Sequence, residues 1–181
     1  MANTLSLREL LREATAPAHA RVDALVGPLD SRSAYLRYLE GMHGFLGAAA
    51  AVLVEEPRLP PLLHVLAGEL GTAGVPVAPV ASPGMDAPAG PAERLGWGYV
   101  TAGASVGARM LHRQATRLDP APGACRFLRA YADSGLWPEW LQRLSQARLD
   151  PGARDRCVAA AKAAFAVAEH SFVRPTEAQH P

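Results

Sequence analysis

The stretch Leu95–Gln114, LGWGYVTAGASVGARMLHRQ, constrains the fold more than any other part of the chain. It is predicted to be helical, yet it contains four glycines, Gly96, Gly98, Gly103 and Gly107. Each glycine inside a helix costs about 1 kcal/mol relative to alanine, so four of them cost roughly 4 kcal/mol. A helix weakened to this extent indicates that its backbone lies close to something else.

One side of this predicted helix, which runs from about residue 92 to residue 118, is nearly bare backbone. Spacings of four, three, four and four residues place on that side Gly96, Val100, Gly103, Gly107 and Leu111. Two interpretations are open: tight packing against another helix, as small residues allow, or contact of the bare backbone with a planar ligand. In the second, Ser105 is a possible polar partner, although such a hydroxyl also commonly bonds to its own preceding turn.

A histidine lies on an otherwise apolar side of the first predicted helix, residues 5–26. At helical spacing, one stripe along this helix contains Leu7, Leu11, Thr15, His19, Val22 and Val26. The simpler interpretation is that His19 is buried and hydrogen-bonded. The alternative is an axial ligand to haem iron, in which one imidazole nitrogen binds the metal and the other needs an acceptor. Asp23, one turn later, is a candidate acceptor, but we expect it to lie in solvent.

Arg12 favours the haem interpretation. It lies seven residues before His19, on the same face and about 10 Å away along the helix axis. This matches the step from the centre of a haem to its propionate edge, where an arginine can bind a carboxylate through two hydrogen bonds. A solvated surface arginine is the alternative. Pro17, between the two residues, predicts either a kink or a restart of the helix with Thr15 as its cap.

The remaining helical segments complete an all-α bundle, because no run of alternating β-branched residues or Asn-Gly hairpin favours a strand. The first of these helices is capped by Ser31 or Ser33 and runs to about Glu55, and the next two cover residues 62–70 and about 124–134. A further helix begins near Trp137, and the last, Asp150–Val173, has Asp150 as its cap.

We expect one domain, residues 1–181, with its core between about residues 5 and 173. The stretch 71–91 is rich in Gly, Pro and Ala and is predicted to be a surface loop. The last residues, 174–181, are expected to be a frayed tail.

Composition excludes several classes of function. The formal net charge is +1 at pH 7, which gives no electrostatic footprint for nucleic acid. No apolar run reaches the ~18–20 residues of a membrane span. Cys125 and Cys157 form no CxxC motif, which argues against a disulfide framework, and both are expected to be buried. The first residues lack the apolar core of a signal peptide, so a cytoplasmic location is expected.

These features together resemble the haem oxygenase family, particularly its compact bacterial members that supply biliverdin to phytochromes. The opening LRELLREATAPAHARVDAL is similar to the "LREAT…H" proximal helix of the family, and YVTAGASVGARML is similar to its distal-helix pattern YVLEGSxLGG. Near the end, AKAAFAVAEHSF is similar to the last core helix. The resemblance extends from about Leu5 to Val173.

The resemblance implies a set of site residues. His19 takes the position of the proximal iron ligand, Arg12 that of a propionate partner, and Gly103 and Gly107 those of the two key distal glycines. The resemblance also implies Arg143 as a second propionate partner, and Phe165 and Phe172 as aromatic walls of the haem pocket. From the glycine-rich helix itself, Val100 is a further candidate haem contact, and Ser105 joins Gly103 and Gly107 as a catalytic candidate. Ala102, Ala104 and Ala108 depart from the family, since related enzymes often carry Glu, Asp and Gly there.

The implied activity is oxidative cleavage of haem to biliverdin, carbon monoxide and ferrous iron. It requires O2 and an electron donor of the ferredoxin, reductase or ascorbate type, and a phytochrome is a possible receiver of the product. Two alternatives stay open. One is a protein of the same fold that binds or senses haem without turnover, and the other is a relative that acts on another small molecule, as thiamine-degrading relatives do.

Overall fold

The structure is a computed structural model that describes residues 5–77, 89–118 and 124–173. The described residues form seven helices and no strand, which confirms the all-α prediction. The helices are α1 (Leu7–Val26), α2 (Arg32–Val52), α3 (Leu59–Thr72), α4 (Pro91–Leu118), α5 (Arg126–Ala132), α6 (Leu136–Gln146) and α7 (Pro151–Phe172).

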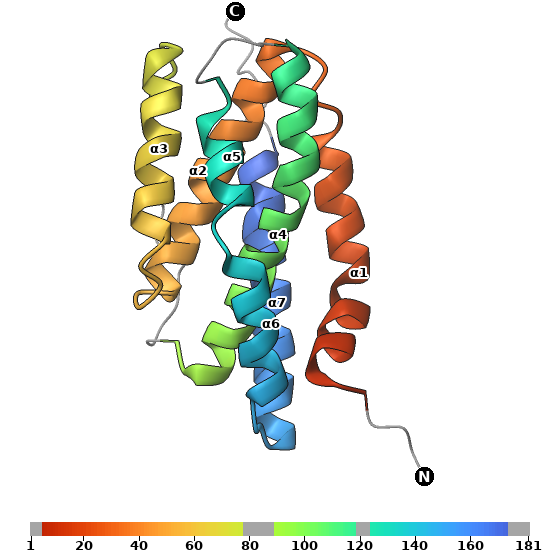
Figure 1. The fold of residues 1–181 in the computed structure, drawn as a ribbon. Coiled ribbons are helices and arrows are strands. Elements are labelled where there is room, and N and C mark those ends of the chain that lie inside the picture. The colour runs from red at the N-terminus through yellow and green to blue at the C-terminus, as the bar shows by residue number, and fades with distance from the viewer. Residues whose placement is uncertain (1–4, 78–88, 119–123, 174–181) are drawn as a thin grey trace, which may run out of the picture.

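The helices form an elongated bundle around α4 and α7, which pack most extensively against each other (Figure 1). Helices α1 and α2 pack on α7, while α5 and α6 pack on α4, and α3 lies outside against α2 and α5. Helices α1, α3, α4 and α7 run in one direction along the bundle, and α2, α5 and α6 run in the other (Figure 1). Helices α1 and α4 are thus held side by side through their shared neighbour α7.

Short polar side chains fix where the long helices begin. Ser6 forms a capping box with Glu9 at the start of α1, because each side chain accepts from the backbone N–H of the other residue. Ser31, and not Ser33, caps α2 by accepting from the backbone N–H of Ala34. Asp150 caps α7 just before Pro151, as predicted.

Helix α1 is continuous through Pro17. Thr15 does not act as a cap, because its hydroxyl donates to the carbonyl oxygen of Leu11 at 2.7 Å. The predicted restart of the helix is therefore wrong. Proline has no N–H to donate, so the turn around Pro17 lacks one hydrogen bond of the helical ladder.

Several predicted boundaries need correction. Helix α3 is longer than the predicted 62–70 because Pro60 fits the first turn, where a backbone N–H has no helical partner. At its other end, α3 includes residues 71 and 72, and α4 already begins at Pro91. The predicted loop 71–91 is therefore too long. Its residues 78–88 lie outside the described residues, as does the predicted tail 174–181.

Backbone geometry also fixes where α5 and α6 begin. Cys125 has a left-handed φ of +55°, so α5 begins at Arg126 and not at Ala124. Gly135 has a φ of +70°, which only glycine adopts at little cost, and α6 begins directly after it.

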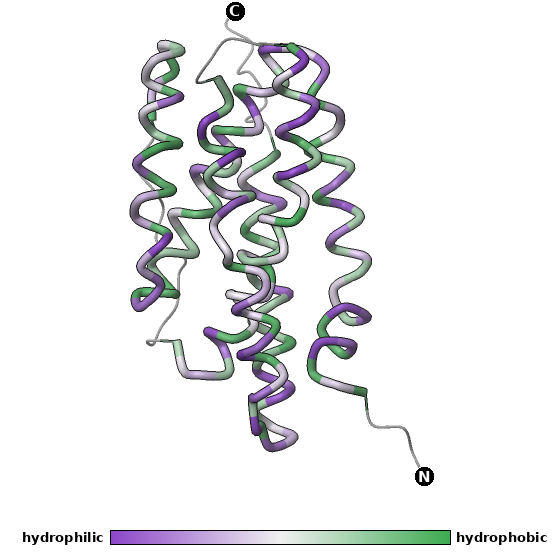
Figure 2. Tube along the Cα trace, viewed as in Figure 1, coloured by the Kyte–Doolittle hydropathy of each residue, from purple (hydrophilic) through white to green (hydrophobic). Residues whose placement is uncertain are grey.

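The core runs along the middle of the bundle, and apolar residues recur along every helix to fill it (Figure 2). Tyr131 is fully buried, and its hydroxyl donates to the carbonyl oxygen of Thr101 inside α4. This bond anchors α5 to the glycine-rich helix. No helix among the described residues combines the length and the apolar character that crossing a lipid bilayer requires.

Candidate functional site

His19 lies on the open side of α1. Its side chain is 64% exposed, and its Nδ1 lies 2.9 Å from Oδ2 of Asp23. Its ring meets the ring of Phe165, from α7, edge to face at 5.8 Å between centroids. The simpler interpretation, a buried histidine, is therefore wrong. Asp23 is 68% exposed, as expected, and its carboxylate also contacts the imidazole.

Arg12 and Thr15 face α4. Burial raises the pKa of Tyr99, and a hydrogen bond with Thr15 and the positive charges of Arg8 and Arg12 oppose that rise. These interactions place the hydroxyl of Tyr99, from α4, beside the face of α1 that carries Arg12. Because α1 and α4 run in the same direction, the turns that follow Thr15 and Tyr99 bring His19 and Gly103 to a similar level of the bundle.

The glycines of α4 serve two different purposes. A Cβ on Gly96 would overlap the backbone carbonyl of Cys157 in α7, and a Cβ on Gly98 would overlap the indole of Trp140 in α6. At these two positions the packing interpretation is correct, because the missing side chains let neighbouring helices approach closely.

The other two glycines face free space. A Cβ on Gly103 would meet only the ring of Trp137, at 3.6 Å, and a Cβ on Gly107 would have no neighbour within 4 Å. Val106 and Met110, on the same side of the helix, are 54% and 61% exposed. We call Gly103, Val106, Gly107 and Met110 the open face of α4. This face is apolar, and no other helix covers Gly107.

Sequence reasoning missed Trp137, Tyr99 and Arg8. The ring of Trp137 lies 5.9 Å from that of Tyr99, and the guanidinium of Arg8 lies 6.0 Å from the indole. Tyr99 is four residues before Gly103, and Arg8 is four residues before Arg12, so helical spacing alone could have found both. Trp137 gave no local signal, because its position depends on how α6 packs against α4.

The structure does not bring Arg143 and Phe172 together with His19. Arg143 forms an ion pair with Glu139 and lies over the ring of Trp140 at 4.7 Å. Phe172 stacks on Tyr38 at 6.0 Å and fills the space beside Gly41 of α2. Both side chains are thus occupied by packing elsewhere, and their roles as haem contacts stay predictions.

Val100 and Ser105 are buried within α4. The hydroxyl of Ser105 donates to the carbonyl oxygen of Ala102 at 2.6 Å, so it bonds to its own preceding turn, as the simpler alternative predicts. Ala102 and Ala108 are fully buried, whereas Ala104 is half-buried. The differences from the family at Ala102 and Ala108 therefore affect packing more directly than the open face.

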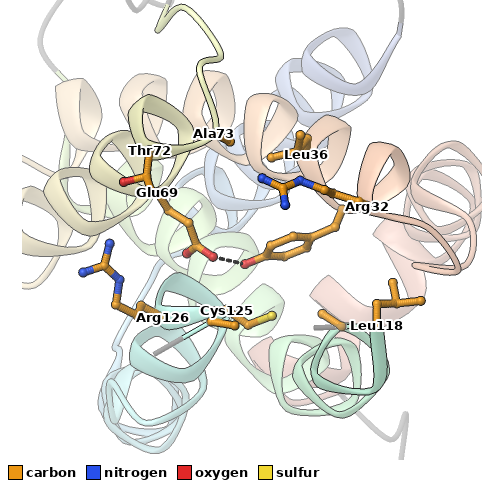
Figure 3. A pocket seen from close by; sticks show the side chains of 11 residues that line it. Arg32, Leu36, Glu69, Thr72, Ala73, Leu118, Cys125 and Arg126 are labelled. Carbon is orange, nitrogen blue, oxygen red and sulfur yellow. Dashed lines mark hydrogen bonds between the residues drawn. The ribbon is translucent and has the colours of Figure 1, made fainter. Parts of the chain in front are cut away.

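Two cavities lie elsewhere in the bundle. One, of about 490 Å³, is formed by α2, α3, the end of α4 and the start of α5 (Figure 3). On its wall, Glu69 accepts from the hydroxyl of Tyr35 at 2.8 Å and from the backbone N–H of Phe127 at 3.0 Å. Burial, followed by the charge of Glu69, raises the pKa of Tyr35. Glu69 therefore joins three helices. The second cavity, of about 460 Å³, lies where α1 and α7 begin.

No family model and no curated protein matches the sequence. Among solved structures, the chain is similar to the haem oxygenase of Neisseria meningitidis, whose structure was determined with NO and CO bound. The TM-score is 0.70, the sequences are 21% identical, and the match covers 98% of this chain and 98% of the other. The chain therefore has the all-α haem oxygenase fold.

Proposed function

We propose that the protein is a haem oxygenase that cleaves haem to biliverdin, carbon monoxide and ferrous iron, with O2 and electrons from an external donor. The observation that carries the proposal is His19: in a chain of this fold, an exposed imidazole held by Asp23 stands on the helix beside the open face of α4. The proposal treats residues 1–181 as one domain, located in the cytoplasm.

The residues present fit a haem. Nδ1 of His19 is engaged by Asp23, which leaves Nε2 available to a metal. Gly107 and the apolar side chains of Val106 and Met110 offer a flat, uncovered surface to a planar ring. When bound, haem supplies the iron at which O2 is activated and the porphyrin ring that is oxidised.

Asp23 has a defined role in this proposal. An Nδ1 proton held by this carboxylate leaves Nε2 with the lone pair that a metal requires. The edge-to-face contact with Phe165 restricts rotation of the imidazole. His19 is therefore oriented before any ligand arrives.

Arg12 sets the orientation of the substrate. Its guanidinium, whose charge lowers the pKa of Tyr99, and the hydroxyl of Tyr99 can both donate to a carboxylate. We assign the propionate edge of the haem to this end. Gly103 and Gly107 then face the ring, because they lie one and two turns beyond Tyr99 along α4.

Titration of purified protein with haem tests the binding step. We expect a Soret band typical of a histidine ligand in the wild type, and its loss in His19→Ala. His64→Ala is the matched control, because His64 is an exposed histidine of α3. A band unchanged in His19→Ala would show that the ligand is not His19.

Addition of a reductant in air tests turnover. Decay of the Soret band with the rise of biliverdin absorbance supports the enzyme. The second candidate is a haem-binding protein without turnover, and it is favoured by the absence of polar side chains from the open face of α4. In that case the Soret band would persist. The proposed partners of the enzyme are a ferredoxin, a reductase or an ascorbate-type donor, and a phytochrome that receives biliverdin.

A further inference from the structure

The second cavity includes neither His19 nor the open face of α4, and it adjoins the candidate haem site through Arg8, which lies over Trp137. Its volume is about 460 Å³, and it is open to solvent on one side and lined by the first turns of α1 and α7 and by the second half of α6 with the residues that follow it. Leu7, Leu141, Leu144 and Leu149 form an apolar wall. A cavity of this volume accommodates a small organic molecule.

Three arginines, Arg8, Arg148 and Arg154, line this cavity, and no aspartate or glutamate does. Arg154 donates to the carbonyl oxygen of Leu5 at 3.0 Å, and Arg148 donates to the carbonyl oxygens at the end of α6 at 3.3–3.5 Å. Neutral carbonyl groups position these two side chains without cancelling their charge.

Among the described residues, none of these three arginines forms an ion pair. The carboxylate of Glu9 is close enough to Arg8 for the arginine's charge to contribute to the lowered pKa of Glu9. The larger cause of that lowered pKa is Ser6, whose hydroxyl and backbone N–H both donate to Glu9. The cavity therefore combines an apolar wall with three arginines that form no ion pair among the described residues.

We propose that this cavity binds a small phosphate monoester. Guanidinium groups match the oxygen geometry of phosphate and bind it through paired hydrogen bonds. The apolar wall would take the organic group of the ester, which explains why the cavity is larger than the phosphate alone needs. Since the backbone carbonyl of Leu5 already holds Arg154, less conformational entropy of that side chain is lost on binding.

Calorimetric titration of the full chain without haem tests the proposal, with phenyl phosphate as the probe and phenol as its neutral analogue. We expect saturable 1:1 binding of phenyl phosphate, weaker binding of inorganic phosphate, and none of phenol. Arg148→Gln should weaken binding about tenfold, the usual effect of losing one charge-assisted hydrogen bond. Arg148 is the residue of choice because it is exposed and its hydrogen bonds are long.

Arg117→Gln is the matched control, because Arg117 is an exposed arginine in the last turn of α4 and does not line the cavity. Equal binding by Arg148→Gln and Arg117→Gln would overturn the assignment, as would the absence of saturable binding in the wild type. Binding to phosphatidic acid vesicles without binding to phenyl phosphate would equally overturn it, because the site would then recognise a lipid surface.

Trp137 provides an independent readout. Arg8 lines the cavity and also lies over the indole of Trp137. Phenyl phosphate should therefore change the tryptophan emission of the wild type and not that of Trp137→Phe. His19→Ala should bind phenyl phosphate as the wild type does, so failure of the haem proposal and failure of this one give different results.

Discussion

At the residue scale, Glu56 is a buried carboxylate with cationic neighbours. Its side chain accepts from Arg58, which also forms an ion pair with Glu139, and Glu139 pairs with Arg143. Burial raises the pKa of Glu56, but the hydrogen bonds from Arg58 and the charges of Arg58 and Arg143 outweigh it, so the net shift is downward. This network connects the α2–α3 turn to α6.

The lowered pKa predicts how stability depends on pH. A carboxylate whose folded-state pKa is depressed stabilises the protein above its unfolded-state pKa, and this contribution is lost as the pH falls through the folded-state pKa. Glu56→Gln should therefore lower the free energy of unfolding by about 2 kcal/mol at pH 7, and by much less near pH 3. Urea unfolding at both pH values measures this. Glu55→Gln, an exposed neighbour, should have no such effect.

Cys157 is predicted to be unreactive in the folded protein. Burial, with a smaller contribution from Glu93, raises the pKa of its thiol to about 11. The thiolate is the reactive form, so at pH 8 Cys157 should resist alkylation until the chain is unfolded. Mass spectrometry after iodoacetamide treatment, with and without denaturant, checks this. Rapid labelling of Cys157 in the folded state would contradict the buried position.

The helix face on which a residue lies could be predicted from the sequence, whereas the neighbours of its side chain could not. Spacing placed His19 and Arg12 on one helix face, and the structure keeps them there with Asp23 in contact. Spacing could not show that Phe172 packs on Tyr38, or that Arg143 belongs to the Glu56 network, because both depend on segments more than 80 residues away in the chain. Periodicity defines the faces of a helix but does not identify their neighbours.

At the element scale, α4 offers a matched pair of glycine substitutions. Gly96→Ala should destabilise the protein by about 3 kcal/mol, because the new methyl group meets the backbone of α7. Gly107→Ala should stabilise the protein without haem by about 1 kcal/mol, since alanine is the better helix former and the space is free. Thermal and urea unfolding measure both effects.

The same pair distinguishes packing from binding. If a haem lies on the open face of α4, Gly107→Ala should weaken haem affinity about tenfold while it stabilises the protein without haem. Opposite effects on stability and affinity are not expected of a position that serves packing alone. Unchanged haem affinity in Gly107→Ala would place the ring elsewhere.

Helix α1 carries a second testable feature, Pro17. An interior proline costs about 3 kcal/mol relative to alanine, and Pro17 is exposed, so its removal loses little packing. Pro17→Ala should therefore raise the free energy of unfolding by about 1–3 kcal/mol. The gain is less than the full cost of the proline, because alanine gives the unfolded chain more conformational freedom. Urea unfolding is the measurement, and a loss of stability would show that the helix needs the proline.

At the scale of the whole molecule, α1 is the least anchored of the long helices. Its buried residues are Leu7, Leu11, Thr15 and Ala18, and none follows Ala18, whereas α2 buries residues along its length. Backbone amides in the second half of α1 should therefore exchange with deuterium faster than those of α4 and α7. Hydrogen exchange with mass spectrometry tests this, and haem should slow exchange there. Equal protection of all long helices would contradict the prediction.

The architecture itself was predictable in part. Caps and helical periodicity predicted the all-α class and the approximate extent of the helices, because these signals lie within a few residues of each other. Bundle order was not predictable, since it follows from contacts such as Gly96 with α7 and Tyr131 with α4. Those contacts decide which side of α4 remains open.

The common direction of α1, α4 and α7 has an electrical consequence (Figure 1). A helix carries about half a positive charge at its N-terminus and half a negative charge at its C-terminus. The N-termini of α1 and α7 place partial positive charges at the end of the bundle that holds Arg8 and Arg154, and the C-terminus of α6 places a partial negative charge at the same end. Because α2, α5 and α6 run against α1, α3, α4 and α7, most of these partial charges cancel along the bundle. What remains acts within one turn of each helix end, where it favours an anionic group beside the first turns of α1 and α7.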